Sequence, residues 1–197
     1  PFLLDSGGNY WRVYLFIEKA KTYDVLENSR QAYEAAKAFG RFQSALSSLP
    51  QPRLHETIPN FHNTPKRFEA LINAVEKDSA NRAKFAKPEI EFTISREKII
   101  GRLLKLCETG NIPERITHND TKINNVMIDD ESGEGICVID LDTVMPGISL
   151  YDFGDLVRTS ASPAAEDEKD LSKVGMRMET FEAIVKGYLE GAGSFLN

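Results

Sequence analysis

The stretch from His118 to Asn125 reads His-Asn-Asp-Thr-Lys-Ile-Asn-Asn, and an apolar run further on, Ile136 to Ile139, ends on Asp140. A kinase needs one carboxylate to orient the attacking hydroxyl, and an amide oxygen with a second carboxylate to hold magnesium against the nucleotide phosphates. Asp120, Asn125 and Asp140 are the residue types for these three roles. The spacing therefore indicates a phosphoryl-transfer site.

The residues after the octet predict a β-hairpin. Val126 to Ile128 read as a strand, residues 129–135 as a turn and Ile136 to Ile139 as the returning strand, which brings Asp140 back beside Asn125. The alternative is a polar loop whose Asp and Asn side chains only satisfy turn backbone. An aspartate at the end of the returning strand favours the catalytic interpretation.

Lys122 stands two residues after Asp120. Its ammonium group could reach the transferring phosphate and offset the charge that develops on the phosphate oxygens. The alternative is a solvated loop lysine.

At this point the sequence resembles a known family. The octet is similar to the aminoglycoside phosphotransferase and choline kinase superfamily, whose loop reads His-Gly-Asp with an Asn five residues on, although Asn119 here replaces the Gly. The segments 140–147 and 151–156 are more similar still to N-acetylhexosamine 1-kinases and their bacterial relatives. The similarity extends from Tyr10 to Leu189.

The resemblance implies roles for individual residues. Asp120 would be the catalytic base, and Asn125 and Asp140 would be ligands of Mg²⁺, with ATP as the phosphoryl donor. Asp155 resembles the aspartate that braces the catalytic loop from a helix. For Asp142 two interpretations stay open: a contact to metal or substrate through water, or the acceptance of hydrogen bonds from the following loop.

Asp152-Phe153-Gly154 spells the string that marks the metal site of protein kinases. We interpret it differently, because the metal aspartate should directly follow a buried strand, whereas Asp152 follows a loop with Pro and Gly. We expect Asp152 to be the N-cap of a helix over residues 153–159. Arg158, in that helix, is expected to pair with a neighbouring aspartate, and the alternative is a contact to substrate or phosphate.

The N-terminal region predicts the end of a small lobe. Trp11 to Ile17 read as its last strand, and Gly7-Gly8 as the turn of a hairpin rather than a phosphate-binding loop. Phe16, Ile17 and Glu18 would then be the hinge, which in this superfamily contacts the adenine of ATP; the alternative is a buried strand without a ligand. The phosphate-binding lysine and covering loop of a kinase are expected before the chain begins, and further helices after it ends.

Apolar spacings of three and four predict four further helical segments. The first is capped by Asn28 or Ser29 and ends at Pro50, and the second is entered through Thr64-Pro65. The third is capped by Ser95 and ends at Gly110, and its inward residues are Ile99, Leu103, Leu106 and Cys107. The fourth covers residues 181–189 and is closed at Gly191.

The segment Leu54 to Asn63 contains His55, Glu56 and His62. The histidine spacing fits no compact zinc motif, so we expect a surface loop. From its position alone, His62 is a candidate to line a sugar pocket.

Composition excludes several classes. The 24 basic and 30 acidic residues give a formal charge of −6, which disfavours a nucleic-acid surface. The sequence shows no apolar run of bilayer length and no signal peptide. Cys107 and Cys137 fall in helical and strand patterns typical of buried thiols, so a cytoplasmic location is expected.

The predicted fold class is α+β, a protein-kinase-like fold. Residues 1–18 would form the last hairpin of the N-terminal lobe and the hinge, and residues 19–197 a mostly helical C-terminal lobe with a small β-hairpin at the active site. The resemblance implies a magnesium- and ATP-dependent kinase for a small-molecule hydroxyl, with the anomeric hydroxyl of an N-acetylhexosamine or related sugar preferred. The alternatives are an aminoglycoside, choline or homoserine kinase of the same fold, and an inactive kinase-like binding module.

Overall fold

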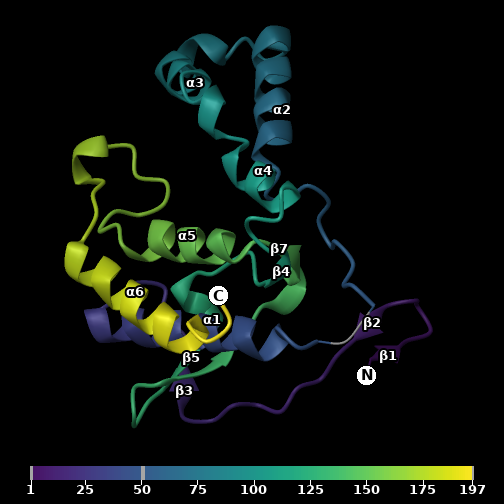
Figure 1. The fold of residues 1–197 in the computed structure, drawn as a ribbon, viewed down its shortest axis with the longest axis vertical. Coiled ribbons are helices and arrows are strands. Elements are labelled where there is room, and N and C mark those ends of the chain that lie inside the picture. The colour runs from purple at the N-terminus through teal and green to yellow at the C-terminus, as the bar shows by residue number, and fades with distance from the viewer. Residues whose placement is uncertain (1, 50–51, 197) are drawn as a thin grey trace.

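The computed structural model describes residues 2–49 and 52–196, so the predicted terminator Pro50 lies outside the described residues. The chain forms a mixed α and β fold of helices and short strands (Figure 1). The helices are α1 Ser29–Leu46, α2 Thr64–Lys77, α3 Lys87–Ile94, α4 Arg102–Glu108, α5 Ser149–Ser160 and α6 Met178–Ala192. The strands are β1 Leu3–Leu4, β2 Tyr10–Trp11, β3 Ala20–Lys21, β4 Arg115–Thr117, β5 Val126–Asp129, β6 Gly135–Val138 and β7 Met145–Gly147.

The core forms where α1, α5 and α6 pack against the β5–β6 hairpin. Its fully buried apolar side chains include Phe39, Val126, Leu156 and Ile184. Asn28 caps α1, as predicted, by accepting the backbone N–H of Gln31. The amphipathic spacing of α1 thus becomes a buried face directly beneath the catalytic region.

Glycines let α1 and α6 approach closely. A Cβ on Gly40 would lie 2.7 Å from the carbonyl oxygen of Tyr188, and one on Gly191 would collide with the backbone of Lys37. The prediction that Gly191 closes the last helix is therefore wrong, because α6 continues to Ala192. Gly191 serves helix packing instead of helix termination.

The predicted hairpin is confirmed. β5 and β6 pair antiparallel, with Val126 opposite Val138, and β3 adds a third strand on the outer edge of β5. The backbone N–H of Ile139 then donates to the carbonyl oxygen of Asn125 at 2.9 Å. This backbone hydrogen bond holds Ile139, the residue before Asp140, next to Asn125.

The N-terminal hairpin is also confirmed, but the strand predicted over 11–17 is wrong. β1 pairs antiparallel with β2, and Gly8 in the turn has φ +82°. β2 covers only Tyr10–Trp11, because no described strand pairs with residues 12–17 and a strand without ladder hydrogen bonds is not held in that conformation.

The region between α1 and the catalytic loop is helical, as Figure 1 shows at the top of the view. α2 is entered through Thr64-Pro65, as predicted, and the structure adds Asn63 as its N-cap. The single helix capped by Ser95 is wrong. Ser95 is instead the C-cap of α3, a 3₁₀ turn (Glu97–Ile99) follows, and α4 begins only after Gly101. Of the four residues predicted to face inward, Ile99 and Leu106 are exposed, whereas Leu103 and Cys107 are half-buried. Gly110, with φ +73°, follows the C-cap of α4, as predicted.

Among the described residues, no helix combines the length and the apolar character that crossing a bilayer requires.

Candidate active site

Two short strands deliver the catalytic loop and the loop after Asp140 to the same place. β4 leads into His118, and it pairs antiparallel with β7, which follows the 3₁₀ turn Leu141–Thr143. The hydroxyl of Thr143 donates to the carbonyl oxygen of His118 at 2.6 Å. Residues about 25 positions apart in the chain are thus joined at the site.

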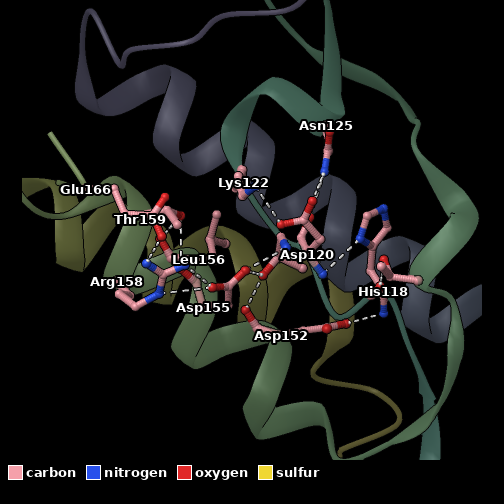
Figure 2. Close-up of polar contacts among 12 residues, drawn as sticks. His118, Asp120, Lys122, Asn125, Asp152, Asp155, Leu156, Arg158, Thr159 and Glu166 are labelled. Carbon is pink, nitrogen blue, oxygen red and sulfur yellow. Dashed lines mark hydrogen bonds and ion pairs between the residues drawn. The ribbon is translucent and has the colours of Figure 1, made fainter. Parts of the chain in front are cut away.

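Asp120 lies at the centre of the close-up in Figure 2, with polar partners on two sides. The amide nitrogen of Asn125 donates to the backbone carbonyl of Asp120 at 2.8 Å and to its Oδ2 at 3.2 Å. Lys122 Nζ lies 3.1 Å from Asp120 Oδ1. The structure therefore brings together three residues that the sequence placed at the site.

The hydrogen bond to Asp120 raises the pKa of Lys122 above its ordinary value. The ammonium group consequently stays charged at neutral pH. Because the Asn125 nitrogen faces Asp120, its Oδ1 remains available as an oxygen ligand for a cation.

His118 is buried below the loop and supports it. Its Nε2 lies 2.9 Å from the carbonyl oxygen of Ile139, and its Nδ1 accepts the backbone N–H of Asp120 at 3.3 Å. These partners require the tautomer with the proton on Nε2. The ring packs edge-on against Phe39 and Phe42, so His118 positions Asp120 rather than reacting itself.

Asn119 replaces the family glycine and has φ +67°, the left-handed region that Asn tolerates better than most residues. Its side-chain nitrogen donates to the carbonyl oxygens of Thr143 at 2.9 Å and Thr117 at 3.2 Å, and its Oδ1 accepts the Thr117 hydroxyl. The side chain therefore ties the catalytic loop to the loop after Asp140, which a glycine could not do.

Asp152 holds the catalytic loop from α5. It is fully buried, and it accepts the backbone N–H groups of His118 at 2.9 Å and Asn119 at 2.8 Å, with Gln43 as a third donor. Burial raises the pKa of its carboxyl group, and the two backbone donors and Gln43 oppose that shift. The prediction of an N-cap is wrong, because α5 begins one turn earlier at Ser149. Both carboxylate oxygens are occupied by protein donors, which agrees with the prediction that this Asp-Phe-Gly string is not the metal site.

Asp155 braces the same loop one turn further along α5. Its Oδ2 accepts the backbone N–H of Thr121 at 2.9 Å, and its Oδ1 pairs with Arg158 at 2.8 Å (Figure 2). Arg158 also pairs with Glu166. The predicted pairing of Arg158 with an aspartate is present, and contact with substrate stays a prediction.

Asp140 lies two residues after the end of β6, directly before the 3₁₀ turn, with φ +59° and an exposed side chain. Asp142 is exposed in the following 3₁₀ turn, and among the described residues it accepts no hydrogen bond from the next loop. Within residues 2–49 and 52–196 no three His, Cys, Asp or Glu side chains gather into a metal-binding group. A two-ligand site of Asn125 and Asp140 needs no such group, because Mg²⁺ in kinases is completed by phosphate oxygens and water.

The hinge residues stay a prediction. Phe16 and Glu18 are exposed and Ile17 is half-buried. In the described part of the chain, no hydrogen bond joins these three residues to the catalytic loop.

The loop before α2 lies at the surface, as predicted. His55 and Glu56 are exposed, while His62 stacks on Tyr151 with ring centroids 4.7 Å apart. Burial lowers the pKa of His62. His62 also lines a small cavity of about 210 Å³ with Asn119 and Tyr151, and its role toward a sugar stays a prediction.

Sequence reasoning missed Gln43 and Thr121. Gln43 is buried on the apolar face of α1, four residues after Phe39, and a polar residue at such a position signals a buried partner. The Thr121 hydroxyl donates to the backbone oxygen of Asp152 at 2.6 Å. No local pattern could have found that contact, which joins residues 31 positions apart.

The fold is that of a kinase-like lobe, in which a candidate catalytic carboxylate, a lysine and a candidate metal pair lie around one hairpin. The chain matches the phosphotransferase enzyme family over residues 2–183, and it belongs to that family. Among solved structures it is similar to an ethanolamine kinase from Plasmodium vivax, with 18% sequence identity and a TM-score of 0.50. The match covers 90% of this chain and 53% of that protein, so the chain spans about half of its length. At this identity the likeness supports the kinase-like fold.

Proposed function

We propose that the protein transfers the γ-phosphoryl group of ATP to a hydroxyl of a small molecule in a magnesium-dependent reaction. The observation that carries the proposal is the position of Asp120, which is held between Asn125 and Lys122 on a loop fixed by Asp152. Membership in the phosphotransferase enzyme family supports the same reaction.

In this mechanism Asp120 orients the acceptor hydroxyl and takes its proton late in the transfer. The acceptor oxygen forms the new bond to phosphorus while the bond from phosphorus to the oxygen of ADP breaks. The ammonium group of Lys122, 3.1 Å from Asp120 Oδ1, would offset the charge that develops on the transferring group. Most of the rate would come from positioning and electrostatics.

Asn125 and Asp140 would hold the magnesium ion, which supplies charge neutralisation at the nucleotide phosphates. Phe16, Ile17 and Glu18 would contact the adenine as the hinge. Asp142 and Arg158 are the remaining candidates for substrate contact.

The preferred acceptor is the anomeric hydroxyl of an N-acetylhexosamine or related sugar, on the resemblance of residues 140–147 and 151–156 to kinases of that kind. A cationic acceptor, such as choline or an aminoglycoside, would favour a cleft with available carboxylates. Of the two candidates for such a cleft, Asp152 is fully buried and occupied by backbone donors, whereas Asp142 is exposed, so only Asp142 could serve a cationic acceptor. The two thiols are both free, which supports a reducing, cytoplasmic location.

The test is ADP release by the full-length natural protein with magnesium-ATP and a panel of N-acetylhexosamines, aminoglycosides, choline, ethanolamine and homoserine. Asp120→Asn should lower kcat by about 10²- to 10⁴-fold, because it removes the proton acceptor while keeping the shape of the side chain. Asp130→Asn, an exposed aspartate ten residues on, is the matched control and should leave kcat unchanged. Turnover by Asp120→Asn within tenfold of wild type would refute the base assignment. Binding of ATP without turnover of any acceptor would support an inactive binding module.

A further inference from the structure

The short segment that carries the candidate metal ligand Asp140 is held at both ends by the catalytic loop. At its start, the backbone N–H of Ile139 donates to the carbonyl oxygen of Asn125, and the carbonyl oxygen of Ile139 lies 2.9 Å from His118 Nε2. At its end, the hydroxyl of Thr143 donates to the carbonyl oxygen of His118 at 2.6 Å. Asp140 therefore lies on a span of three residues between two anchors.

The side chain of Asn119 supplies a second hydrogen bond at the Thr143 anchor. Its nitrogen donates to the carbonyl oxygen of Thr143 at 2.9 Å and to that of Thr117 at 3.2 Å, and its Oδ1 accepts the hydroxyl of Thr117 at 2.9 Å. Asn119 is 4% exposed, so water does not compete for these bonds. We call the two bonds that Thr143 makes, to the Asn119 side chain and to the His118 carbonyl oxygen, the Thr143 clamp.

The backbone of Asp140 has a conformation that its surroundings must hold. Its φ is +59°, in the left-handed region, which residues other than glycine adopt at a cost in free energy. Such a conformation persists where the structure fixes the chain on both sides of it. If the Thr143 clamp is lost, φ of Asp140 is free to relax, and its carboxylate then changes direction. The direction of the candidate metal ligand thus depends on the clamp.

The partners of Asp120 do not depend on the Asn119 side chain. Asp120 contacts Asn125 and Lys122, and neither contact passes through Asn119. Asp152 holds the loop through the backbone N–H of Asn119, which any residue other than proline provides. Glycine also adopts the φ of +67° found at this position without strain. Removal of the Asn119 side chain should therefore affect the metal ligand and spare the proposed base.

We propose that Asn119 is a positioning residue for the magnesium site. Through Thr143 it fixes the direction of Asp140, and it thereby sets the magnesium concentration that ATP binding requires. The inference rests on the proposed magnesium-dependent phosphotransferase function. It adds a buried residue that acts on a metal ligand through another residue.

The experiment is calorimetric titration of the full-length protein with ATP at a series of free magnesium concentrations, for wild type and Asn119→Gly. Loss of the buried hydrogen bond to Thr143 should raise the magnesium concentration for half-maximal ATP affinity about tenfold. Affinity for ATP without magnesium should stay within about twofold of wild type. In parallel kinetics, kcat at saturating magnesium should stay within about threefold, because Asp120 keeps its partners. A purely structural role would lower the thermal midpoint without this shift in magnesium dependence.

Asn81→Gly is the matched control. Asn81 is an exposed asparagine with φ +51° in the turn after α2, so the variant makes the same substitution in the same region of backbone conformation. It should change neither the magnesium dependence nor kcat. The control separates the effect of the lost clamp from the effect of a glycine at positive φ.

Thr143→Val tests the other bond of the clamp and decides the outcome if Asn119→Gly does not fold. Valine keeps the shape of threonine and removes the hydroxyl that reaches His118, so the required magnesium concentration should rise about threefold or more. Thr159→Val is its control, because the Thr159 hydroxyl bonds only to backbone of α5.

The outcomes distinguish this inference from the proposed function. Magnesium dependence within about twofold of wild type in both clamp variants would overturn the inference, and wild-type turnover with magnesium-ATP would leave the proposed function standing. A loss of kcat at saturating magnesium without a shift in magnesium dependence would also overturn it, because Asn119 would then act on the base. Wild-type protein that neither turns over any acceptor nor binds ATP more tightly with magnesium would refute the proposed function, and the inference with it.

Discussion

The carboxylate of Asp152 accepts the backbone N–H of Asn119 at 2.8 Å, although the two residues are 33 positions apart in the chain. Asp152 also accepts the N–H of His118, so one buried side chain of α5 fixes the backbone directly before Asp120. This carboxylate therefore ties the stability of the fold to the conformation of the loop that carries Asp120.

Asp152→Asn should lower the free energy of unfolding by about 2–3 kcal/mol, because charge-assisted hydrogen bonds are lost and a buried N–H is left facing an amide nitrogen. The measurement is chemical denaturation. Asp170→Asn is the control, since Asp170 caps an exposed 3₁₀ turn and its loss should cost about 1 kcal/mol or less. Equal losses for both variants would show that Asp152 acts only as a local cap.

Local patterns predicted the parts of this site that local structure builds. Two short apolar runs on either side of a polar turn predicted the β5–β6 hairpin, and the hairpin fixes Ile139, the residue before Asp140, to Asn125. The helix that Asn28 caps, α1, was predicted in the same way from its cap and its apolar spacing.

The errors arose where distant partners decide the structure. Asp152 has the local appearance of an N-cap, yet its hydrogen-bond partners come from the catalytic loop and from Gln43 on α1. Gly191 has the appearance of a helix terminus, yet the close approach of α1 requires it within α6. Asn119 differs from the family glycine, and only the structure shows that its side chain joins two loops.

Asp140→Ala should abolish the dependence of ATP binding on magnesium, because Asp140 is the only carboxylate in the proposed metal pair. The measurement is calorimetric titration of ATP with and without Mg²⁺, using the full-length protein. Asp130→Ala, also exposed and ten residues before Asp140, is the matched control and should keep magnesium-dependent affinity within about threefold of wild type. Asp142→Ala is measured alongside, because Asp142 is a candidate contact to the metal through water. Unchanged affinity in Asp140→Ala would move the metal site elsewhere, and loss in Asp142→Ala would make that residue a ligand.

His62 should make stability depend on pH in the weakly acidic range. Its pKa is lowered mainly by burial, and the charge of Asp155 opposes the shift only in part. Because an unfolded histidine takes up its proton near pH 6.5, the unfolded state binds the proton first as pH falls. The contribution of neutral His62 is therefore fully present above pH 6.5 and is lost as pH falls toward the lower pKa of the folded state.

His62→Gln removes this titration, so the thermal midpoint of wild type relative to the variant should decrease between pH 7.5 and pH 5. Thermal unfolding of both proteins in matched buffers measures that difference. The two proteins have the same carboxylates, so the effect of these groups on the pH dependence cancels in the difference. His55→Gln, an exposed histidine of the same loop, should show no such trend. A difference for His62→Gln that stayed constant with pH would contradict this prediction. The His62 imidazole would then take up its proton as readily in the folded protein as in the unfolded chain, and its burial would not change its pKa.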